Sequence, residues 1–365
     1  YGWIGTLEES ENDLWSLTMG AEHEFSNSFL SYDVSYSSNE RTIINDTELN
    51  MDMEPDDRFF VFGYRTFDPR GDIAVDILNG RDPTDLSQMT EGEFEIVNGT
   101  REEDVFQAKI NWERYFQFGD ASFEFKTGAK YRSSDQFRDE NVTLYEMDED
   151  FPYADVLTPV DDVLFLKQRY FEVRPRAGFT LLNSNPDLFE FVEDDSLEDS
   201  NVADFDANET ISAAYVMGTY EIGIHRLIAG VRFEQYDWEN TNKRVSYLNE
   251  IPGVSTVTNG GKHDFWLPGI HLRHELTENL ILRESYNRSY GRPVLEDLSR
   301  GRFTDDEGNI EDGNPFLEPA ISDNFDIQLE YYTDQGGLYS IGYFRKDIEN
   351  FSFTTVGEFD DLDAN

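Results

Sequence analysis

Apolar and polar residues alternate along much of this chain with a period of two, which predicts β-strands. After Trp15, for example, the apolar residues Leu17 and Met19 fall on one face of an extended chain, and the polar residues Ser16 and Thr18 fall on the other. The same alternation predicts ten strands, in the segments 15–25, 30–37, 106–113, 121–132, 209–220, 226–239, 264–276, 279–290, 322–333 and 337–350.

The predicted strands differ from those of a soluble β-sandwich in length and in the character of their polar face. Most span roughly 10–15 residues, whereas strands of soluble proteins usually span about 5–6. Their polar face carries charge, as at Arg232 and Glu234 or at Asp326 and Glu330. Alternating segments of about ten residues, apolar outside and polar inside, are typical of outer-membrane barrels. The pattern therefore predicts an all-β fold, an antiparallel transmembrane β-barrel, with a large soluble sheet as the alternative.

The connections between the predicted strands alternate in length. Short turns are predicted near 26–28, 119–120, 221–225, 277–279 and 334–336, and long external loops at 40–103, 133–208, 240–263 and 291–321. Outer-membrane barrels have short turns on the periplasmic side and long loops outside. Segment 168–181 also looks extended, but Pro175 cannot donate to a β-ladder. We therefore place that segment inside the loop 133–208.

Composition excludes several classes of function. The 365 residues carry a formal net charge of −47 and no cysteine. Nucleic-acid binding needs a basic surface, and disulfide scaffolds need cysteine, so neither is expected. Aromatic residues make up 15% of the chain, which argues against a disordered acidic polymer.

More than half of the acidic residues lie in three of the predicted external loops, 40–103, 133–208 and 291–321. Solubility in a salty medium and divalent-ion bridging to lipopolysaccharide would explain them, and recognition of a cationic or metal-bearing ligand is the alternative. A Ca²⁺ site at Asp305, Asp306 and Asn309 is a further hypothesis, although these residues lack the spacing of an EF-hand loop. No other cofactor is expected.

No pattern of residues indicates catalysis. The chain has no HExxH or GxSxG motif and no phosphate-binding glycine loop. His271 and His274 are three residues apart on a predicted strand, so they should point to opposite faces and cannot share a metal ion. We expect a protein that is not an enzyme.

Several motifs in the last third of the chain, in consistent order, resemble the TonB-dependent outer-membrane receptors. Segment 282–293 looks like the family's strand that ends in an Arg-Pro pair, here Arg292-Pro293. The heptapeptide Gly313-Asn314-Pro315-Phe316-Leu317-Glu318-Pro319 matches the family's GNPxLxP element. The hairpin 324–348, which contains Lys346 and Asp347, and the segments 214–217 and 229–234 are also similar to the family. For Arg292, Pro293, Gly313, Asn314, Pro315, Leu317, Pro319, Lys346 and Asp347 we expect structural roles.

The resemblance implies a barrel of about 22 strands filled by an N-terminal plug, which carries the TonB-contacting box. No plug-like segment precedes Tyr1, and ten crossings are under half of such a barrel. We therefore expect residues 1–365 to be part of one receptor barrel domain without its plug.

The implied function is TonB-dependent active transport of a scarce, bulky nutrient, an oligosaccharide or a siderophore or other metal chelate, across the outer membrane of a Gram-negative bacterium. The implied partners are outer-membrane lipid and lipopolysaccharide, the nutrient, and TonB-ExbB-ExbD acting through the plug. A passive porin and a soluble, secreted, acidic β-rich binding protein are the alternatives.

Alternation also predicts which residues face lipid and which face the lumen. Lumen or outer-rim positions that could contact ligand are Arg232, Glu234, Tyr236, Trp238, Trp266, Arg283, Asn287 and Tyr290. Salt bridges within the barrel wall are the alternative for the two arginines, and the interfacial aromatic girdle is the alternative for the four aromatic residues. Arg283, Ser285, Asn287 and Ser289 should share the lumenal face, with Leu282 and Tyr286 outward. Glu284 is then an outward carboxylate that should lie near an interface or pair with Arg273 or another strand neighbour. The expected lipid-facing residues are Ala213, Tyr215, Val231, Phe233, Ile270, Leu272, Ile327, Leu329, Ile341 and Tyr343.

Overall fold

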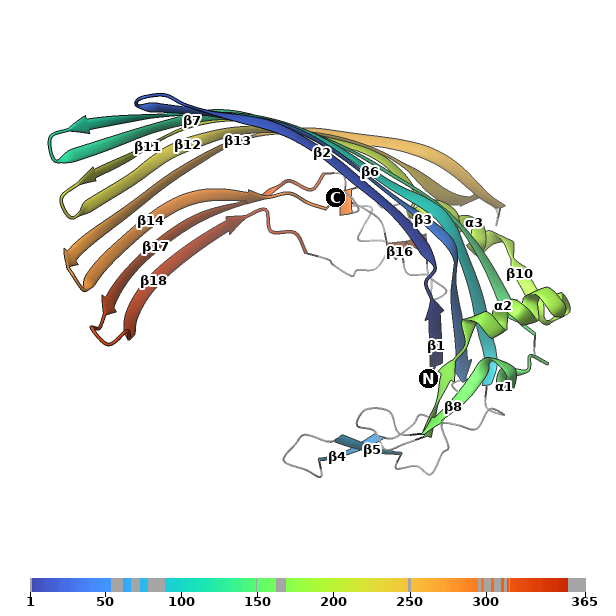
Figure 1. Cartoon of the computed structure of the whole chain (residues 1–365). Coiled ribbons are helices and arrows are strands. Elements are labelled where there is room, and N and C mark those ends of the chain that lie inside the picture. Colours follow the sequence, from blue (N-terminus) through green and yellow to red (C-terminus); the bar gives the residue numbers. More distant parts are fainter. Residues whose placement is uncertain are drawn as a thin grey trace.

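A computed structural model describes residues 2–53, 62–66, 73–77, 89–148, 150–161, 169–248, 251–294, 297–298, 303–304, 310–311, 314 and 316–353. Most of them form one antiparallel sheet that curves into an open arc, as Figure 1 shows. Its strand order is β1-β3-β6-β7-β11-β12-β13-β14-β17-β18, with β2 beside β1 on the edge of β3 and β10 on β7. The strands are β1 (Gly2–Leu7), β2 (Ser10–Glu24), β3 (Ser28–Met53), β6 (Met89–Phe118), β7 (Ala121–Met147), β10 (Phe189–Val192), β11 (Phe205–Ile222), β12 (His225–Leu248), β13 (Ile251–Thr277), β14 (Leu280–Gly291), β17 (Ala320–Tyr332) and β18 (Leu338–Glu349).

Each of the ten predicted segments coincides with one of these strands or lies within one, to about one residue at its ends. The predicted short turns are also confirmed. In two of them Gly119 and Gly223 adopt positive φ angles of 61° and 54°, a conformation that favours glycine and suits tight hairpins. Most of the strands are longer than predicted, and β6 reaches 30 residues. A tilted strand of about 9–11 residues crosses a bilayer, so the longest strands extend well beyond one.

The prediction of a loop at 240–263 is wrong. The segment is a two-stranded ribbon in which β12 and β13 stay paired from Asn240–Asn259 to Leu248–Ile251. Residues such as Val245, Thr256 and Val257 favour extended backbone, so the ladder continues past the charged positions that suggested a loop. In the same way β3, β6 and β7 extend into the predicted loops 40–103 and 133–208.

Helices and short strands pack on the convex face at the far end of β3, β6 and β7 (Figure 1). The segment predicted as extended, 168–181, is instead β9 (Arg169–Val173) followed by α2 (Pro175–Ser184). Pro175 occupies the first turn of α2, where a missing N–H and a fixed φ are tolerated. Together with α1 (Tyr153–Val156), these elements cover a hydrophobic core that includes Leu49, Met51 and Phe94. The remaining described elements are β4 (Phe62–Thr66), β5 (Ile73–Ile77), β8 (Leu157–Asp161), η2 (Pro186–Leu188), β15 (Phe303–Thr304) and β16 (Ile310–Glu311).

Helix α3 (Glu193–Val202) closes an exposed edge of β7. β11 pairs with β7 only as far as Arg138, and β10 takes over at Leu144. The N–H groups of Glu140, Val142 and Leu144 donate to side-chain oxygens of Asp204, Ser200 and Ser196 respectively, each at 2.8 Å. The two serines lie one helical turn apart on α3, and Asp204 follows the helix by one further turn, so all three face the strand. Unpaired strand edges invite aggregation, and this cover removes the hazard.

The convex face carries an apolar band at the level of the short turns. Residues directly opposite on neighbouring strands share a face, so the register places Val231, Phe233, Ile270 and Ile327 together on the convex side. On β11 the band runs from Ala214 to Ile222, about nine residues or roughly 30 Å of strand. At a strand tilt of about 40° this gives ~23 Å of height, close to the ~25 Å apolar band of outer-membrane barrels.

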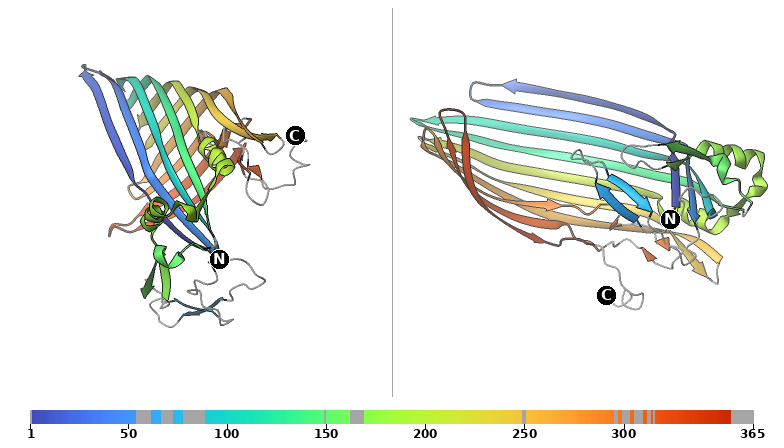
Figure 2. Two further views of the ribbon diagram at one scale, coloured as in Figure 1. Left: turned by 90° about the vertical axis from the view of Figure 1, so that its right-hand side faces the viewer. Right: turned by 90° about the horizontal axis from the view of Figure 1, so that it is seen from below.

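The band runs obliquely to the ladder. Tyr36 on β3 shares a cross-strand row with Phe106, Ser133, Thr210 and Asp237. The same row therefore holds an aromatic residue on β3 and a charged residue on β12. Tilted strands in a barrel produce this stagger, and the tilt is visible in Figure 2. None of the helices that the structure describes is long and apolar enough to cross a membrane.

Two of the predicted lipid-facing residues are on the wrong side. Ala213 lies opposite Glu234 and Tyr215 opposite Arg232, so both face the concave side, and the Tyr215 hydroxyl donates to Asn111 at 2.8 Å. The other eight, Val231, Phe233, Ile270, Leu272, Ile327, Leu329, Ile341 and Tyr343, lie on the convex face.

Candidate functional site on the inner wall

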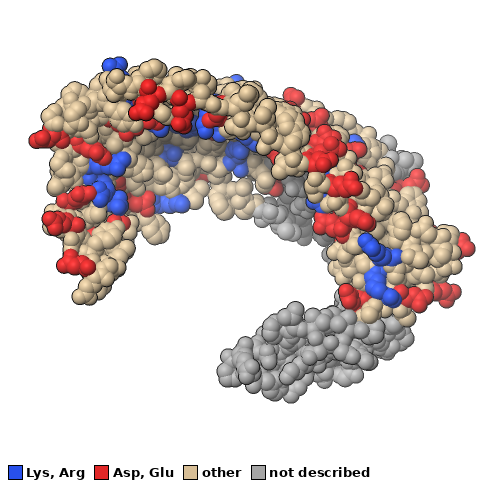
Figure 3. All heavy atoms as spheres, in the orientation of Figure 1, with Lys and Arg blue, Asp and Glu red and all other residues tan. Residues whose placement is uncertain are grey.

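The concave face is polar and carries several ion pairs. Lys109 lies 2.9 Å from Asp33, Arg226 lies 3.1 Å from Glu221 and Arg283 lies 3.1 Å from Glu330. Figure 3 shows Lys and Arg side chains gathered along this side of the arc. A wall of ion pairs suits contact with water, whereas the opposite face of the same strands is apolar.

The buried carboxylate of Glu209 on β11 accepts hydrogen bonds from β12 and from the chain that follows β14. The hydroxyl of Tyr236 donates to Glu209 Oε1 at 2.6 Å, and Arg292 Nη1 donates to the same oxygen at 3.0 Å. The Arg292 guanidinium also lies over the Tyr236 ring, 5.0 Å from its centroid, at cation–π distance. Tyr236 is 0% exposed. Arg292, expected from the family motif to be structural, therefore holds the chain after β14 against the wall.

A second buried carboxylate, Glu234, accepts hydrogen bonds from the neighbouring wall and from the end of β14. Arg232 Nε donates to it at 2.7 Å, and the hydroxyl of Tyr290 also donates to it. The Tyr290 ring stacks on Phe265 of β13, with centroids 3.9 Å apart and an interplanar angle of 10°. The paired charges and donors offset the desolvation of Glu234.

Tyr290 reaches this site because the end of β14 separates from β13, although it stays paired with β17 up to Gly291–Ala320. The pairing of β14 with β13 ends at Asn287–Gly269. In Figure 1, β13 continues beyond the end of β14, and the chain after β14 lies on the concave side. By alternation alone Tyr290 would share the outward face of Tyr286, but beyond Asn287 no pairing with β13 holds this end of β14 in the wall, and the Tyr290 side chain contacts Phe265 and Glu234.

The apolar part of the site is a small core on the concave face. Leu298 is 1% exposed and packs with Tyr236, Trp238 and Phe265. Trp238 lies flat over Gly261, where an added Cβ would come within 2.6 Å of the indole nitrogen. We call residues 290–294 and 297–298 the inner strap, because they cross this wall and are bound to it by Tyr290, Arg292 and Leu298.

The GNPxLxP element braces the strap. Asn314 N–H donates to the Asp297 carbonyl at 2.8 Å, and the Asn314 side chain accepts from Phe316 N–H at 2.9 Å. Leu317 packs against the same hydrophobic cluster. The Pro319 carbonyl accepts a bond from Asn350 at 3.4 Å. Gly313, Pro315 and the proposed calcium ligands Asp305, Asp306 and Asn309 lie outside the described residues.

The structure brings together five of the eight predicted contact residues, namely Arg232, Glu234, Tyr236, Trp238 and Tyr290. Trp266 does not belong with them, because it lies opposite Phe233 on the convex face, where it is 63% exposed. Arg283 lies elsewhere on the concave wall, beside a hollow of about 490 Å³ that is also lined by Arg226, Arg273 and Asp326. Sequence reasoning missed Glu209, Phe265 and Leu298, although Glu209 and Phe265 have the parity of the predicted wall residues.

The predicted faces of β14 are confirmed up to Asn287. Arg283 and Ser285 lie on the concave wall, and Tyr286 shares the convex face with Phe325. Glu284 points outward beside Leu272 and Ile327, and its carboxylate lies 3.7 Å from His274 rather than near Arg273.

The register also separates the histidines as predicted. His274 lies on the convex face opposite His225, with their Nδ1 atoms 2.6 Å apart, and His271 lies on the concave wall. Among the residues that the structure describes, no group of three or more His, Asp or Glu side chains is arranged to hold a metal ion.

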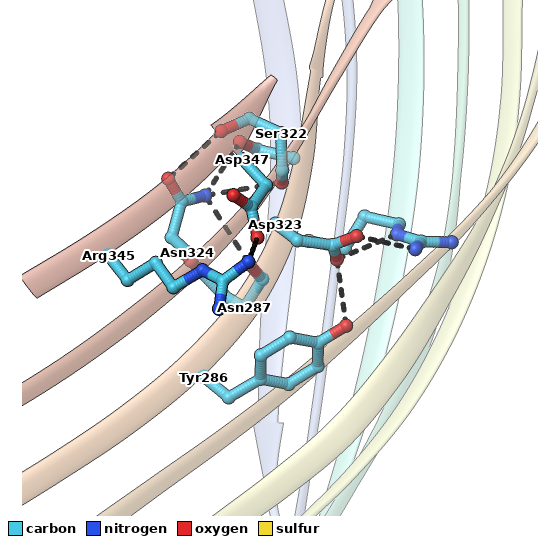
Figure 4. A network of polar contacts seen from close by, with 9 residues as sticks. Tyr286, Asn287, Ser322, Asp323, Asn324, Arg345 and Asp347 are labelled. Atoms are coloured by element: carbon cyan, nitrogen blue, oxygen red, sulfur yellow. Dashed lines mark hydrogen bonds and ion pairs between the residues drawn. The ribbon is translucent and has the colours of Figure 1, made fainter. Parts of the chain in front are cut away.

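The outer ends of β14, β17 and β18 carry a separate polar network, shown in Figure 4. Tyr286 donates to Asp323 at 2.8 Å, and Arg288 binds the same carboxylate through Nε and Nη2 at 2.9 and 2.7 Å. Arg345 lies 2.8 Å from Asp347. On the concave side of these strands, the Asn324 amide donates to the carbonyl of Asn287 at 3.3 Å and lies opposite Lys346.

These features define the class of protein: the chain forms part of the wall of a β-barrel whose outside faces lipid and whose inside faces water. The model of the TonB dependent receptor-like β-barrel family matches residues 2–363, and the chain belongs to this family.

Solved structures with the same fold include the ferric-catecholate import receptor Fiu of E. coli K12 in its closed form. It is 14% identical, has a TM-score of 0.51, and is matched over 94% of this chain and 42% of its own. The siderophore receptor PiuA of Acinetobacter baumannii is 15% identical, with a TM-score of 0.48, over 94% of this chain and 41% of its own. The chain thus spans about two-fifths of the length of these receptors. No protein with a curated description matches it in sequence.

Proposed function

We propose that this chain is part of the wall of an outer-membrane receptor that takes up a scarce, bulky nutrient by TonB-dependent active transport in a Gram-negative bacterium. The observation that carries the proposal is the two-sidedness of the long strands. Their convex face is an uncovered apolar band, and their concave face is lined with ion pairs. Family membership supports the same conclusion.

In this proposal the outer-membrane lipid and lipopolysaccharide contact the convex band, and the nutrient meets the concave wall and the long extramembrane ribbons. Energy would come from TonB-ExbB-ExbD acting through a plug inside the barrel. Two ligand classes are compatible with the fold, oligosaccharides and siderophores or other metal chelates. Fiu, described as a ferric-catecholate import receptor, is an example of the second class.

Cells lacking the gene and complemented cells test this function. Uptake of a ⁵⁵Fe-catecholate complex and of ¹⁴C-labelled maltohexaose should be compared in both, with and without a protonophore. We expect the complemented cells to accumulate one of the two probes, and the protonophore to abolish the difference. Uptake that survives the protonophore would indicate a passive porin, and recovery of the protein without detergent would indicate a soluble binding protein.

A further inference from the structure

We propose that the concave wall beneath the inner strap is a ligand-binding site, which the strap fills until a ligand replaces it. The ligand of this site is an uncharged, hydroxyl-rich molecule of the saccharide class. The proposal rests on the proposed function and narrows its ligand. It starts from what the strap presents to the wall, namely one phenol hydroxyl, one guanidinium and one leucine side chain.

The wall beneath the strap is built to accept hydrogen-bond donors next to flat apolar surfaces. Its two carboxylates, Glu209 and Glu234, are buried, at 8% and 7% exposure. They are bordered by the rings of Tyr236, Trp238 and Phe265. A sugar offers hydroxyl donors at its rim and C–H groups on its ring face, and both features fit carboxylates flanked by aromatic rings.

The charge balance of the site argues against an anionic chelate. With the strap in place, Arg232 and Arg292 balance the two carboxylates. When the strap leaves, Arg292 leaves with it, and Glu209 keeps only the Tyr236 hydroxyl among these partners. The open site then carries one uncompensated negative charge. A half-buried site of this sign repels an anionic ferric catecholate and tolerates a neutral polyol.

The strap is attached in a way that allows it to be replaced. Its first end lies where β14 has already separated from β13, its last end is held by Leu298 and by the Asn314 N–H bond to the Asp297 carbonyl, and Val294 between these contacts is 63% exposed. Releasing Tyr290 and Arg292 without a substitute would leave buried carboxylates short of donors, which is unfavourable. A ligand that donates to the same oxygens removes that penalty, so ligand binding and strap release are coupled.

The same strand provides a matched control for a test. Tyr286 and Arg288 have the same spacing as Tyr290 and Arg292 and also donate to carboxylate, but both bind Asp323, on the convex side. Tyr290→Phe with Arg292→Gln should open the site, and Tyr286→Phe with Arg288→Gln should not. Both double variants are made in the full-length receptor in detergent micelles, each with a nitroxide at Val294→Cys.

We expect the strap variant to shift the nitroxide spectrum towards fast motion and to bind maltohexaose, cellohexaose or xylohexaose at least tenfold more tightly than the wild type in calorimetry. The control variant should match the wild type in both readouts. Leu298→Ala, which removes only the apolar contact, should mobilise the label in the same direction if the double variant fails to fold.

An unchanged spectrum, or no gain for any of the three oligosaccharides, would overturn the proposal. A gain for the ferric complex of 2,3-dihydroxybenzoate instead would overturn the assignment of ligand class. Energy-dependent uptake by cells is a separate measurement, so failure here is distinguishable from failure of the proposed transport function.

Discussion

The convex face of β3, β6 and β7 has two regions: in one, protein covers the apolar side chains, and in the other they are exposed. At the far end, Leu49 and Phe94 are 0% exposed beneath α1, α2 and their neighbours. At the level of the short turns, Tyr32, Ile110 and Tyr131 on the same strands and the same face are 41–47% exposed. Within the described residues, no second layer covers them.

The difference shows where the surrounding solvent changes. In water, covering apolar surface gains about 25 cal/mol per Å², so an apolar sheet face needs a protein layer. In hydrocarbon no such gain exists, because lipid chains are as apolar as the side chains. The protein layer therefore belongs to the part of the strands that projects beyond the membrane, and the uncovered part belongs in lipid.

The largest expected effect follows from removing a covered side chain. Phe94→Ala should lower the free energy of opening of the covered end by about 3–5 kcal/mol, because it leaves a cavity under α2. Ile110→Ala, in the uncovered band, should cost under ~1 kcal/mol, because lipid chains as apolar as the side chain fill the space. Hydrogen exchange of the α2 amides and urea unfolding in micelles would measure the two effects. Equal losses would remove the distinction between the regions.

A charge placed in the band tests the band itself. Leu282→Arg should destabilise the inserted barrel by about 2 kcal/mol, the order of cost for a basic residue facing lipid. Ser285→Arg is the matched change on the concave side, where Asp326 lies directly opposite, and should cost far less. Folding into liposomes at graded urea concentrations compares them. A normal Leu282→Arg with a defective Ser285→Arg would invert the assigned faces.

Glu95 should make the stability of the extramembrane part depend on pH. Burial, with the nearby carboxylates of Asp199 and Glu48, raises the pKa of Glu95 to about 7. The folded state therefore holds this proton more tightly than the unfolded state, and stability falls as pH rises from about 4.5 to 7. Glu95→Gln should add about 1–2 kcal/mol at pH 8, after allowance for solvent screening of a half-buried group, and almost nothing at pH 4. Urea unfolding at both pH values measures this, and a pH-independent effect would contradict it.

The smallest expected effect concerns the carboxylate that faces outward in the band. Acidic residues cost less than basic ones in this position, and His274 lies 3.7 Å from Glu284. Glu284→Leu should leave insertion unchanged or improve it by under ~1 kcal/mol, measured by the same liposome assay. A clear loss of stability would mean that this pair holds β13 and β14 together.

Alternation predicted the strands well because a period of two is a local property of each segment. It failed for Ala213 and Tyr215 because β11 is apolar on both faces, so its own pattern does not say which side is out. Only the pairing with β12, opposite Glu234 and Arg232, decides this. Helix α2 was missed because the segment 168–181 looks extended in sequence, although Pro175 starts a helical turn within it.

The candidate site was half predictable for the same reason. Arg232, Glu234, Tyr236 and Trp238 share one parity on one strand, and the sequence predicts them together. The contacts of Tyr290 and Arg292 depend on where the ladder between β13 and β14 ends, which no local pattern encodes. Trp266 was predicted to lie on the concave wall, but its neighbour Phe265 is the residue whose side chain lies there.

The most direct test of the two-sided wall is a nitroxide scan of β12 from position 227 to 233 in liposomes, with oxygen and a water-soluble nickel chelate as relaxation agents. We predict that labels at Leu227, Ala229, Val231 and Phe233 are relaxed mainly by oxygen, and that labels at Ile228, Gly230 and Arg232 are relaxed mainly by the nickel chelate. A scan without this alternation, or odd positions shielded from both agents, would contradict a wall that faces lipid on one side and water on the other.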